Sequence, residues 1–249
     1  MMKKLRADQL VFMQNLAESR EKAQRYIMAD LIEQILPDGN RIPVKKAGQQ
    51  YAEDAIFSLK EKEKYVSRGA YKLLTLIDHF NIDIRDKICL DAGASTGGFT
   101  DCLIQHGAKK VYAIDVGHNQ LHEKLLNNEK VINLEGINLR YAKQDLINEK
   151  IDILVSDVSF ISLTLILPPC IKWLKNGGLI CALIKPQFEL GPNETVKGVV
   201  KDENKRQLAV NKITTFCEKE LKLITKGIVP STIKGPKGNQ EYMALFEKK

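Results

Sequence analysis

The chain has 249 residues, which is enough for one complete α/β domain and a small second domain. Its 38 Lys and Arg residues outnumber 31 Asp and Glu residues, and the net charge of +7 favours an anionic partner such as nucleic acid or a membrane surface. The longest apolar stretches, such as residues 178–184, are too short to span a bilayer, and no apolar core follows the first lysines. We therefore expect neither a transmembrane helix nor a signal peptide.

The five cysteines are scattered along the chain, most of them in apolar surroundings. None stands in a CxxC pair or at the spacing of metal ligands, so they indicate small core residues of a protein in the reducing cytoplasm. His118 and His122 are spaced i, i+4 and could hold a metal on one helix face, but no third ligand is near them in the sequence. A solvated helix face explains them better, and we expect no metal site.

Two short helices are predicted near the N-terminus, over residues 8–14 and 19–29, with Ser19 as the N-cap of the second. Residues 37–40, with the sequence Pro-Asp-Gly-Asn, predict a turn between two short strands. Because so few residues bury little apolar surface, we expect a small α+β module that docks on RNA or on the neighbouring domain.

A charged run follows this module. Residues 59–64, with the sequence Leu-Lys-Glu-Lys-Glu-Lys, contain a single large apolar side chain and are typical of a linker. We therefore expect a small domain over residues 1–58 and a larger domain over residues 65–249.

The larger domain alternates helix-like and strand-like segments. Residues 67–80 show a helical apolar stripe, and the apolar runs after them are mostly separated by segments of helical length, which predicts a parallel, doubly wound sheet covered on both faces. Residues 221–246 predict two more strands joined by the loop 234–239, and such strands pair antiparallel at or near a sheet edge. The apolar runs are residues 88–90, 111–114, 131–134, 151–155 and 179–184.

A glycine-rich turn follows the first of these strands. From Asp91 the chain reads D-x-G-x-x-x-G-G, which differs from the G-x-G-x-x-G turn that cradles a pyrophosphate. A carboxylate there would repel a diphosphate and attract a cation, and S-adenosylmethionine carries a sulfonium and an ammonium but no phosphate. The turn thus favours S-adenosylmethionine over NAD, and three glycines without a packing role favour a ligand over a structural turn. The residues expected to bind it are Asp91, Gly93, Ala94, Ser95, Thr96, Gly97, Gly98 and Phe99.

Polar residues also end the second and third strands. Asp115 ends the second strand, 24 residues after Asp91, where a carboxylate can accept hydrogen bonds from both ribose hydroxyls of an adenosine. This spacing occurs in binders of dinucleotides and of methyl donors, so it indicates adenosine without choosing between them. Asn138 follows the third strand, where its side chain could meet the adenine edge.

A carboxylate and a lysine end the fourth and fifth strands. Asp157 follows the fourth strand, and Lys185 directly follows four apolar residues of the fifth, so we expect both in the ligand crevice at the carboxyl edge of the sheet. A lysine there is either an ion-pair partner of Asp157 or a functional group, and the two roles are compatible.

Five longer motifs resemble one known family, the hemolysin A (TlyA) proteins, which are related to the FtsJ-type ribose 2′-O-methyltransferases. The resemblance extends from Lys3 to Phe246. It implies a Rossmann-like S-adenosylmethionine-dependent methyltransferase fold, in which one strand of a seven-stranded, otherwise parallel sheet runs antiparallel. The motifs are residues 65–73 (YVSRGAYKL), 91–102 (DAGASTGGFTDC), 157–163 (DVSFISL), 185–189 (KPQFE) and 235–241 (GPKGNQE).

The same resemblance implies a catalytic tetrad of Lys72, Asp157, Lys185 and Glu241. A free lysine, with a pKa of about 10.4, is protonated at neutral pH and cannot act as a base, but burial and a neighbouring like charge favour its neutral form. We therefore expect Lys185, beside Lys72, to take the proton of a ribose 2′-hydroxyl. Lys72 and Asp157 would hold the hydroxyl and the methyl donor in line, Glu241 would orient a lysine, and no metal is required.

The N-terminal module resembles an S4 RNA-binding domain in residues 5–10 (LRADQL) and 17–23 (AESREKA). It departs from that domain at residues 30–34 (DLIEQ) and at 39–40, where the usual Asn-Gly order is inverted. Residues 1–64 hold 12 Lys and Arg against 10 Asp and Glu, a net charge of +2. The RNA contacts that we expect are Arg6, Arg20, Lys22, Arg25 and, in the larger domain, Arg68.

The resemblance implies 2′-O-methylation of a cytidine ribose, with ribosomal RNA or ribosomal subunits as partner. Three rival functions remain. A membrane-acting lysin is suggested by the family's historical name, but no segment has a membrane-active pattern. An NAD-dependent oxidoreductase conflicts with the charge of Asp91, and a non-catalytic RNA-binding protein conflicts with the complete tetrad.

Overall fold

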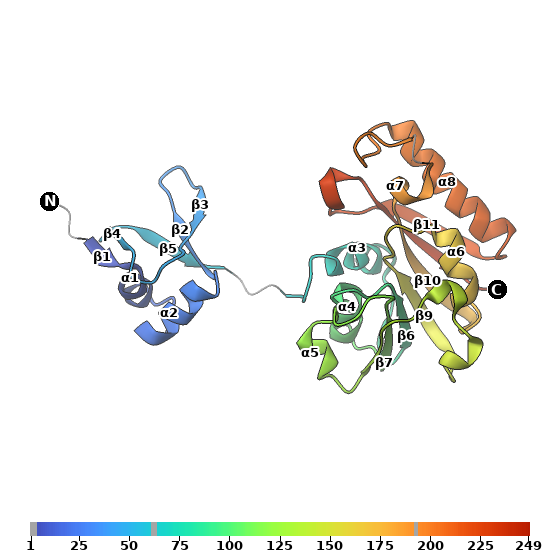
Figure 1. Ribbon diagram of the computed structural model, residues 1–249, viewed down its shortest axis with the longest axis horizontal. Helices are drawn as coiled ribbons and strands as arrows, with labels where there is room; N and C mark the ends of the chain where they lie inside the picture. Colours follow the sequence, from blue (N-terminus) through green and yellow to red (C-terminus); the bar gives the residue numbers. More distant parts are fainter. Residues whose placement is uncertain (1–3, 61–63, 192–193) are drawn as a thin grey trace. The chain divides into compact units, whose positions relative to one another are not determined.

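The chain forms two compact units, Met1–Lys64 and Tyr65–Lys249 (Figure 1). The computed structural model describes residues 4–60, 64–191 and 194–249. No helix in these ranges is both long and apolar enough to cross a membrane, and no group of three His, Cys, Asp or Glu side chains in them is arranged to hold a metal ion. All five cysteines are buried, and none of them forms a disulfide.

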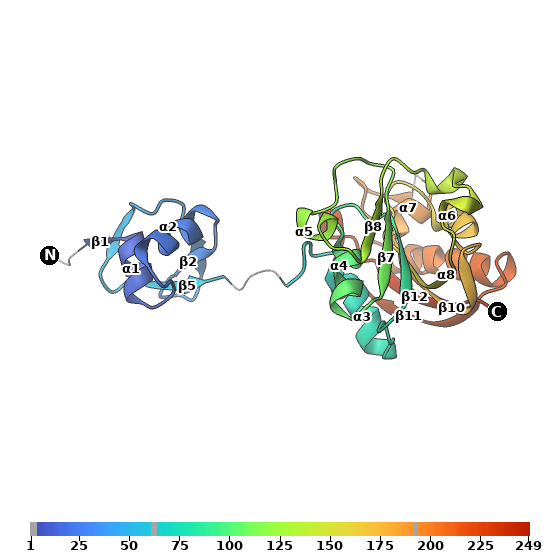
Figure 2. The ribbon, with the colours of Figure 1, turned by 90° about the horizontal axis from the view of Figure 1, so that it is seen from below.

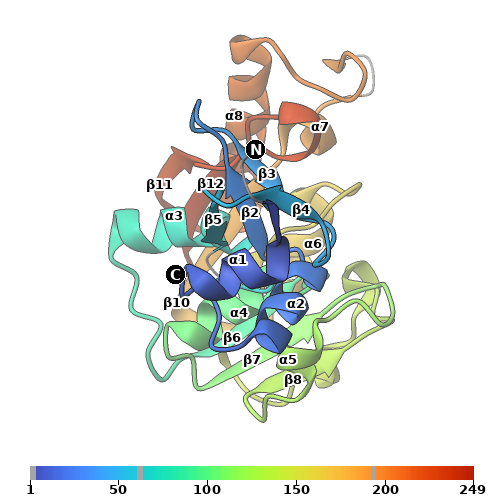
Figure 3. The ribbon, with the colours of Figure 1, turned by 90° about the vertical axis from the view of Figure 1, so that its left-hand side faces the viewer.

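The N-terminal unit is a small α+β module. Helices α1 (Ala7–Met13) and α2 (Arg20–Met28) lie side by side (Figure 3), and Ser19 caps α2 by accepting a 3.1 Å hydrogen bond from the Lys22 amide. Strands β2, β3 and β5 form an antiparallel sheet with β2 in the centre, and β1 pairs with β4. These strands are β1 (Lys4–Arg6), β2 (Ile32–Ile35), β3 (Arg41–Pro43), β4 (Gln50–Ala52) and β5 (Ile56–Leu59).

The start of the expected linker needs correction. Leu59 is the last residue of β5 and pairs with Ile32, and the Lys60 amide donates a 2.7 Å hydrogen bond to the Leu31 carbonyl. Strand pairing therefore continues into the first residues of the predicted linker. The reason is that Leu59 belongs to the apolar pattern of β5, which begins at Ile56. Residues 61–63 of that segment lie outside the described residues.

The larger unit is built on a seven-stranded sheet with the order β11-β12-β10-β9-β6-β7-β8. Strand β12 runs antiparallel to both of its neighbours, and the other six strands are parallel to one another. The sheet confirms the predicted fold class. Its strands are β6 (Ile88–Ala92), β7 (Lys110–Ile114), β8 (Val131–Leu134), β9 (Ile151–Ser156), β10 (Leu174–Ile184), β11 (Ile224–Pro230) and β12 (Tyr242–Glu247).

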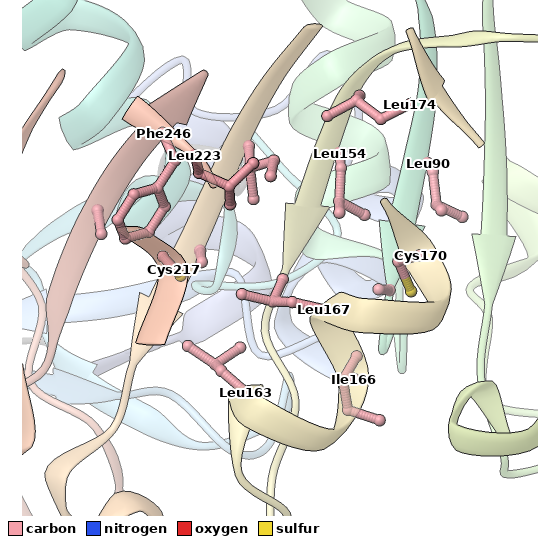
Figure 4. Close-up of a cluster of buried hydrophobic side chains, with 14 of the residues drawn as sticks. Leu90, Leu154, Leu163, Ile166, Leu167, Cys170, Leu174, Cys217, Leu223 and Phe246 are labelled. Carbon is pink, nitrogen blue, oxygen red and sulfur yellow. The ribbon is translucent and has the colours of Figure 1, made fainter. Parts of the chain in front are cut away.

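Helices cover both faces of this sheet (Figure 2). Neighbouring strand residues point to opposite faces, so Cys89 belongs to the core beneath α3 (Ala70–Phe80) and α4 (Gly98–Gln105), while Leu90 belongs to the core on the other face. That second core packs α6 (Leu163–Cys170) and α8 (Glu203–Lys219) against the strands (Figure 4). Two shorter helices are α5 (Glu123–Leu126) and α7 (Pro186–Glu189).

The connection between β8 and β9 contains two 3-10 turns, η1 (Leu139–Tyr141) and η2 (Gln144–Leu146), where the sequence pattern left the crossover open. The indole N–H of Trp173 donates a 2.8 Å hydrogen bond to the Gln144 carbonyl. This bond holds the connection against the end of the sheet at which β10 begins.

Candidate active site

Two cavities lie at the carboxyl edge of the parallel strands, where the sequence placed the ligand crevice. The larger, about 410 Å³, is lined by Asp115 after β7, Asn138 after β8 and Asp157 after β9, together with apolar side chains such as Ile137. The smaller, about 160 Å³, shares Asp157 with the first and adds Lys185 after β10. The larger cavity is mostly apolar and the smaller cavity is mostly polar, and they meet at Asp157.

Most residues predicted to bind the cofactor lie at these two cavities. The exceptions are Asp91 and Gly97, which line neither of them. Asp91 is fully buried within β6, and Gly97 packs beneath α5. The residues that line at least one cavity are Gly93, Ala94, Ser95, Thr96, Gly98, Phe99, Asp115, Asn138 and Asp157.

Glycine is needed at the three positions of the turn for different structural reasons. Gly93 has a φ of +90°, and a Cβ there would come within 2.9 Å of Val158 at the cavity wall. Gly97 has a φ of +93°, and a Cβ would collide with Leu125 of α5. A Cβ on Gly98 would collide with Ser67. The prediction that these glycines have no packing role is therefore wrong for Gly97 and Gly98. The backbone of Gly93, in contrast, is exposed at the cavity.

Asp115 fastens the glycine-rich turn to the end of β7. Its two oxygens each accept a 2.8 Å hydrogen bond from a backbone amide, one from Ser95 and one from Gly117. Each carboxylate oxygen retains a second lone pair, so Asp115 can still accept hydrogen bonds from two hydroxyl groups of a ligand.

Asp91 lies beneath the turn as a buried carboxyl group. Desolvation raises its pKa to about 7, a 2.7 Å hydrogen bond from Thr100 opposes that rise, and the negative charge of Asp157 adds to it. Its Oδ1 atom is buried and has no hydrogen-bond partner among the described residues. Together with Asp115 and Asp157, it gives this edge of the sheet a negative potential that suits a cationic ligand and repels a diphosphate.

The four predicted catalytic side chains converge beside the smaller cavity. Lys72 of α3 places Nζ 2.7 Å from Glu241 Oε2 and 3.8 Å from Asp157 Oδ2, and Lys185 Nζ lies 2.6 Å from Asp157 Oδ1. Glu241 is fully buried, and the two lysines are 8% and 6% exposed. Because β12 runs antiparallel, its first residues lie at the edge where β9 and β10 end, which brings Glu241 to Lys72.

Sequence reasoning missed several contacts around this cluster. Lys185 Nζ also donates a 2.7 Å hydrogen bond to Ser159 Oγ, and Gln187 donates one of 3.1 Å to Glu241 Oε1. The Phe188 ring lies 5.8 Å from Lys185 Nζ and 5.0 Å from the ring of Phe160. Each of these four residues, Ser159, Phe160, Gln187 and Phe188, follows a predicted catalytic residue by two or three positions. That short spacing is the signal in the sequence that could have identified them.

Phe160 is the most unusual of these neighbours. It is 90% exposed, lines the larger cavity and has a φ of +63°. A bulky residue with this backbone conformation is a strained outlier, and such strain gathers at functional sites. The exposed ring lies against Phe188, which contacts Lys185, and offers a flat apolar surface beside the predicted catalytic cluster.

The predicted RNA-binding side chains occupy different environments. Arg6 and Arg20 lie 2.8 and 3.4 Å from the buried carboxylate of Asp8, and Lys22 pairs with Glu18 at 2.9 Å. Hydrogen bonding to Arg6 lowers the pKa of Asp8 to about 2. Two guanidinium groups are thus held half-exposed on the surface of the N-terminal unit. The remaining two predicted side chains, Arg25 and Arg68, are exposed.

The sheet order and the carboxyl-edge cavities are those of the Rossmann-like methyltransferase fold. A family model described as FtsJ-like methyltransferase matches residues 65–248. The chain belongs to this family, and within it to the hemolysin A/TlyA proteins.

Relatives of the chain extend over almost its whole length. It is 41% identical to hemolysin A of Brachyspira hyodysenteriae over 97% of this chain and 99% of that protein. It is 36% identical to the 16S/23S rRNA (cytidine-2′-O)-methyltransferase TlyA of Mycobacterium tuberculosis, over 97% of this chain and 89% of that one. A solved structure of a candidate hemolysin from Streptococcus thermophilus is 41% identical, with a TM-score of 0.74 over 100% of this chain and 90% of the other.

Proposed function

We propose that this protein transfers a methyl group from S-adenosylmethionine to the ribose 2′-hydroxyl of a cytidine in ribosomal RNA. The observation that carries the proposal is the convergence of Lys72, Asp157, Lys185 and Glu241 beside the cavities. The printed name of the M. tuberculosis relative supports the choice of substrate. Ribosomal RNA as substrate implies that the protein acts in the cytoplasm.

The larger cavity fits the methyl donor, which supplies a sulfonium methyl group to a nucleophile. Asp115 would accept the hydrogen bonds of the adenosine ribose, and Asn138 would meet the adenine edge between apolar side chains. The backbone bared at Gly93 allows a close approach. Asp91 would act through its charge, because its carboxyl group lies beneath the cavity wall without lining it.

Lys185 is the proposed base that removes the proton of the 2′-hydroxyl. Its Nζ atom is bonded to Asp157 and to Ser159. As the proposed base, Lys185 has to be neutral before the hydroxyl reacts, so Asp157 needs another cationic partner at that stage. Lys72 lies 3.8 Å from the other oxygen of Asp157 and is placed to become that partner.

Glu241 is the proposed positioning residue of the tetrad. It accepts hydrogen bonds from Lys72 on one oxygen and from Gln187 on the other, so both of its oxygens are satisfied in a fully buried position. Lys72 is thereby held as a cation that points toward Asp157. A fixed cation at this point would orient the hydroxyl for in-line attack.

Two further features fit an RNA substrate. The exposed ring of Phe160 beside Phe188 would stack on the target base, since single-stranded bases are commonly held on aromatic side chains. The N-terminal unit would act as an S4-like RNA-binding domain through Arg6, Arg20 and Arg25, and residues from 65 onward would form the methyltransferase domain.

The test is methyl transfer from labelled S-adenosylmethionine to unmethylated 16S and 23S rRNA transcripts and to ribosomal subunits, followed by mapping of 2′-O-methyl groups. Wild-type protein and a Lys109→Ala control should label one cytidine, because Lys109 is exposed at the opposite end of β7. Lys185→Ala should not. Label on a base, or no label on any of these RNAs, contradicts the proposal.

A further inference from the structure

A two-residue hairpin lies in the connection between α7 and α8. Val196 and Val199 pair antiparallel through two backbone hydrogen bonds of 3.0 Å, and the residues between them are Lys197 and Gly198. Their φ angles are +51° and +78°. Two positive φ values are typical of a type I′ turn, which favours Asn, Asp or Gly at the first position. Lysine therefore occupies a backbone conformation that its side chain disfavours.

A second lysine–glycine turn has the same character. Lys237 and Gly238, in the loop before β12, have φ angles of +57° and +83°. This turn is closed by backbone hydrogen bonds from the Gly235 amide to the Asn239 carbonyl (2.9 Å) and from the Gly238 amide to the Gly235 carbonyl (3.1 Å). Two lysines thus carry the same conformational cost.

The side chain of Asn239 joins the two turns into one structure. It is 3% exposed, its Oδ1 accepts a 3.0 Å hydrogen bond from the Val200 amide, and its Nδ2 donates one of 2.9 Å to the Gly198 carbonyl. Lys237 Nζ also lies 3.5 Å from the Lys197 carbonyl. We call this unit, residues 196–200 with 234–239, the paired lysine turns.

The paired lysine turns contact the catalytic cluster. A Cβ added at Gly235 would collide with the carboxylate of Glu241, so the loop backbone passes directly against that side chain. Glu241 in turn holds Lys72. A polymer whose reacting group occupies the tetrad would therefore pass close to these turns.

The lysines of this unit are available to an anion. Of the carboxylates nearby in the sequence, Glu194 and Glu203 pair with Lys205 and Arg206, and Asp202 accepts a hydrogen bond from the Asn204 amide at the start of α8. In the part of the chain that the structure describes, no carboxylate lies within ion-pair distance of the exposed side chains Lys197, Lys234 and Lys237.

We propose that the paired lysine turns bind backbone phosphates of the RNA strand beside the target nucleotide. Contacts to phosphates fix the register of a nucleic acid without reading its sequence, and lysine binds phosphate as a mobile point charge. The identity of the ligand, an RNA strand, rests on the proposed function. It adds to the catalytic unit an RNA contact that is separate from the arginines of the N-terminal unit.

The test variant is Lys197→Asn with Lys237→Asn. Asparagine removes the charge and tolerates a positive φ better than lysine, so the fold should be kept. The matched control is Lys222→Asn. Lys222 is also exposed with a positive φ, of +56°, but it precedes β11 at the end of that strand opposite the tetrad.

Binding of an unmethylated 23S rRNA transcript is measured over a series of salt concentrations. The double variant should bind about tenfold more weakly or worse at 0.1 M salt, and its slope of log affinity against log salt should fall by about 1.5, since each lost phosphate contact contributes about 0.7 to 0.9. The RNA KM should rise, while kcat and the affinity for S-adenosylmethionine stay unchanged. The control, and Lys197→Arg with Lys237→Arg, should match the wild-type protein.

Three outcomes would overturn the assignment. The first is an unchanged salt slope in the asparagine variant, and the second is an equal loss in the arginine variant, which keeps the charge. The third is normal binding to the naked transcript with weak binding to assembled subunits, which would assign the turns to a ribosomal protein. Methyl transfer is measured separately, so an inactive wild-type protein that still binds RNA would contradict the proposed function while leaving this comparison valid.

Discussion

Lys72 and Glu241 are 169 positions apart in the sequence and are joined by a buried hydrogen bond of 2.7 Å. Glu241→Ala removes the partner that compensates the charge of Lys72, which remains buried. Breaking a buried pair from one side typically costs roughly 3 kcal/mol or more, so the free energy of unfolding in urea should fall by about that amount.

Glu247→Ala is the comparison for this measurement. Glu247 pairs with Lys226 at 3.0 Å between neighbouring strands, but the two side chains are 31% and 46% exposed. An exposed pair contributes about 1 kcal/mol or less. Equal losses in the two variants would show that burial of the Lys72–Glu241 pair has no energetic consequence.

Substitutions of Lys185 distinguish a general base from a residue that only forms an ion pair with Asp157. As a base, its replacement by Ala should lower the rate of methyl transfer by roughly 10²–10⁴, with S-adenosylmethionine binding preserved. Lys185→Arg should be nearly as inactive, because a guanidinium stays protonated and cannot accept the hydroxyl proton. Single-turnover rates and melting temperatures of both variants are the measurements. Near-native turnover of the Arg variant would restrict Lys185 to neutralising Asp157.

Asp91 makes stability and ligand binding depend on pH in opposite directions. Its pKa rises from 3.8 to about 7 on folding, so the folded state binds the proton more tightly than the unfolded chain. This group therefore destabilises the fold increasingly as pH rises from about 4 to 7 and fully above 7, by as much as about 4 kcal/mol. Asp91→Asn should raise the melting temperature at pH 8 much more than at pH 4.

The same substitution should weaken binding of the cationic methyl donor. In the wild-type protein, ionisation of Asp91 as pH rises through 7 should strengthen S-adenosylmethionine binding, and the Asn variant should lose that dependence. Titration calorimetry at pH 6 and pH 8 measures both. Equal pH dependence in the two proteins would exclude Asp91 as the responsible group.

Asp115 should contribute to donor affinity through direct hydrogen bonds. Asp115→Ala removes a charge-assisted bond to the ribose, a loss on the order of 1.5–3 kcal/mol in binding free energy. It also frees the Ser95 and Gly117 amides. Asp115→Asn keeps one acceptor oxygen and should lose less. Unchanged affinity of the Ala variant would remove Asp115 from the donor site.

Local patterns in the sequence were enough to predict the sheet but not the environment of each strand end. The apolar runs located the central strands because buried parallel strands are continuous in apolar residues. They did not show that β6 continues through Ala92, which places Asp91 inside the strand and beneath the cavity wall. In the same way, Leu59 looked like the start of a charged run but ends β5.

Long-range partners and exposed aromatic residues were harder to predict. No spacing relates Lys72 to Glu241, and the pair was predicted from family motifs alone. The sequence did not show that Phe160 is 90% exposed, because its environment depends on a loop conformation with positive φ. The contacts of Gly97 and Gly98 come from α5 and from Ser67, which local sequence does not bring near them.

The late position of β12 in the chain also determines when the fold and the predicted tetrad become complete. The cavity walls are supplied by segments up to Lys185, but Glu241 arrives with the strand that enters the finished sheet between β10 and β11. A nascent chain that has not yet produced β12 lacks Met243, Ala244, Leu245 and Phe246, which are buried in the cores on both faces of the sheet. Neither the two cores of the sheet nor the predicted tetrad is therefore complete until synthesis has passed this strand.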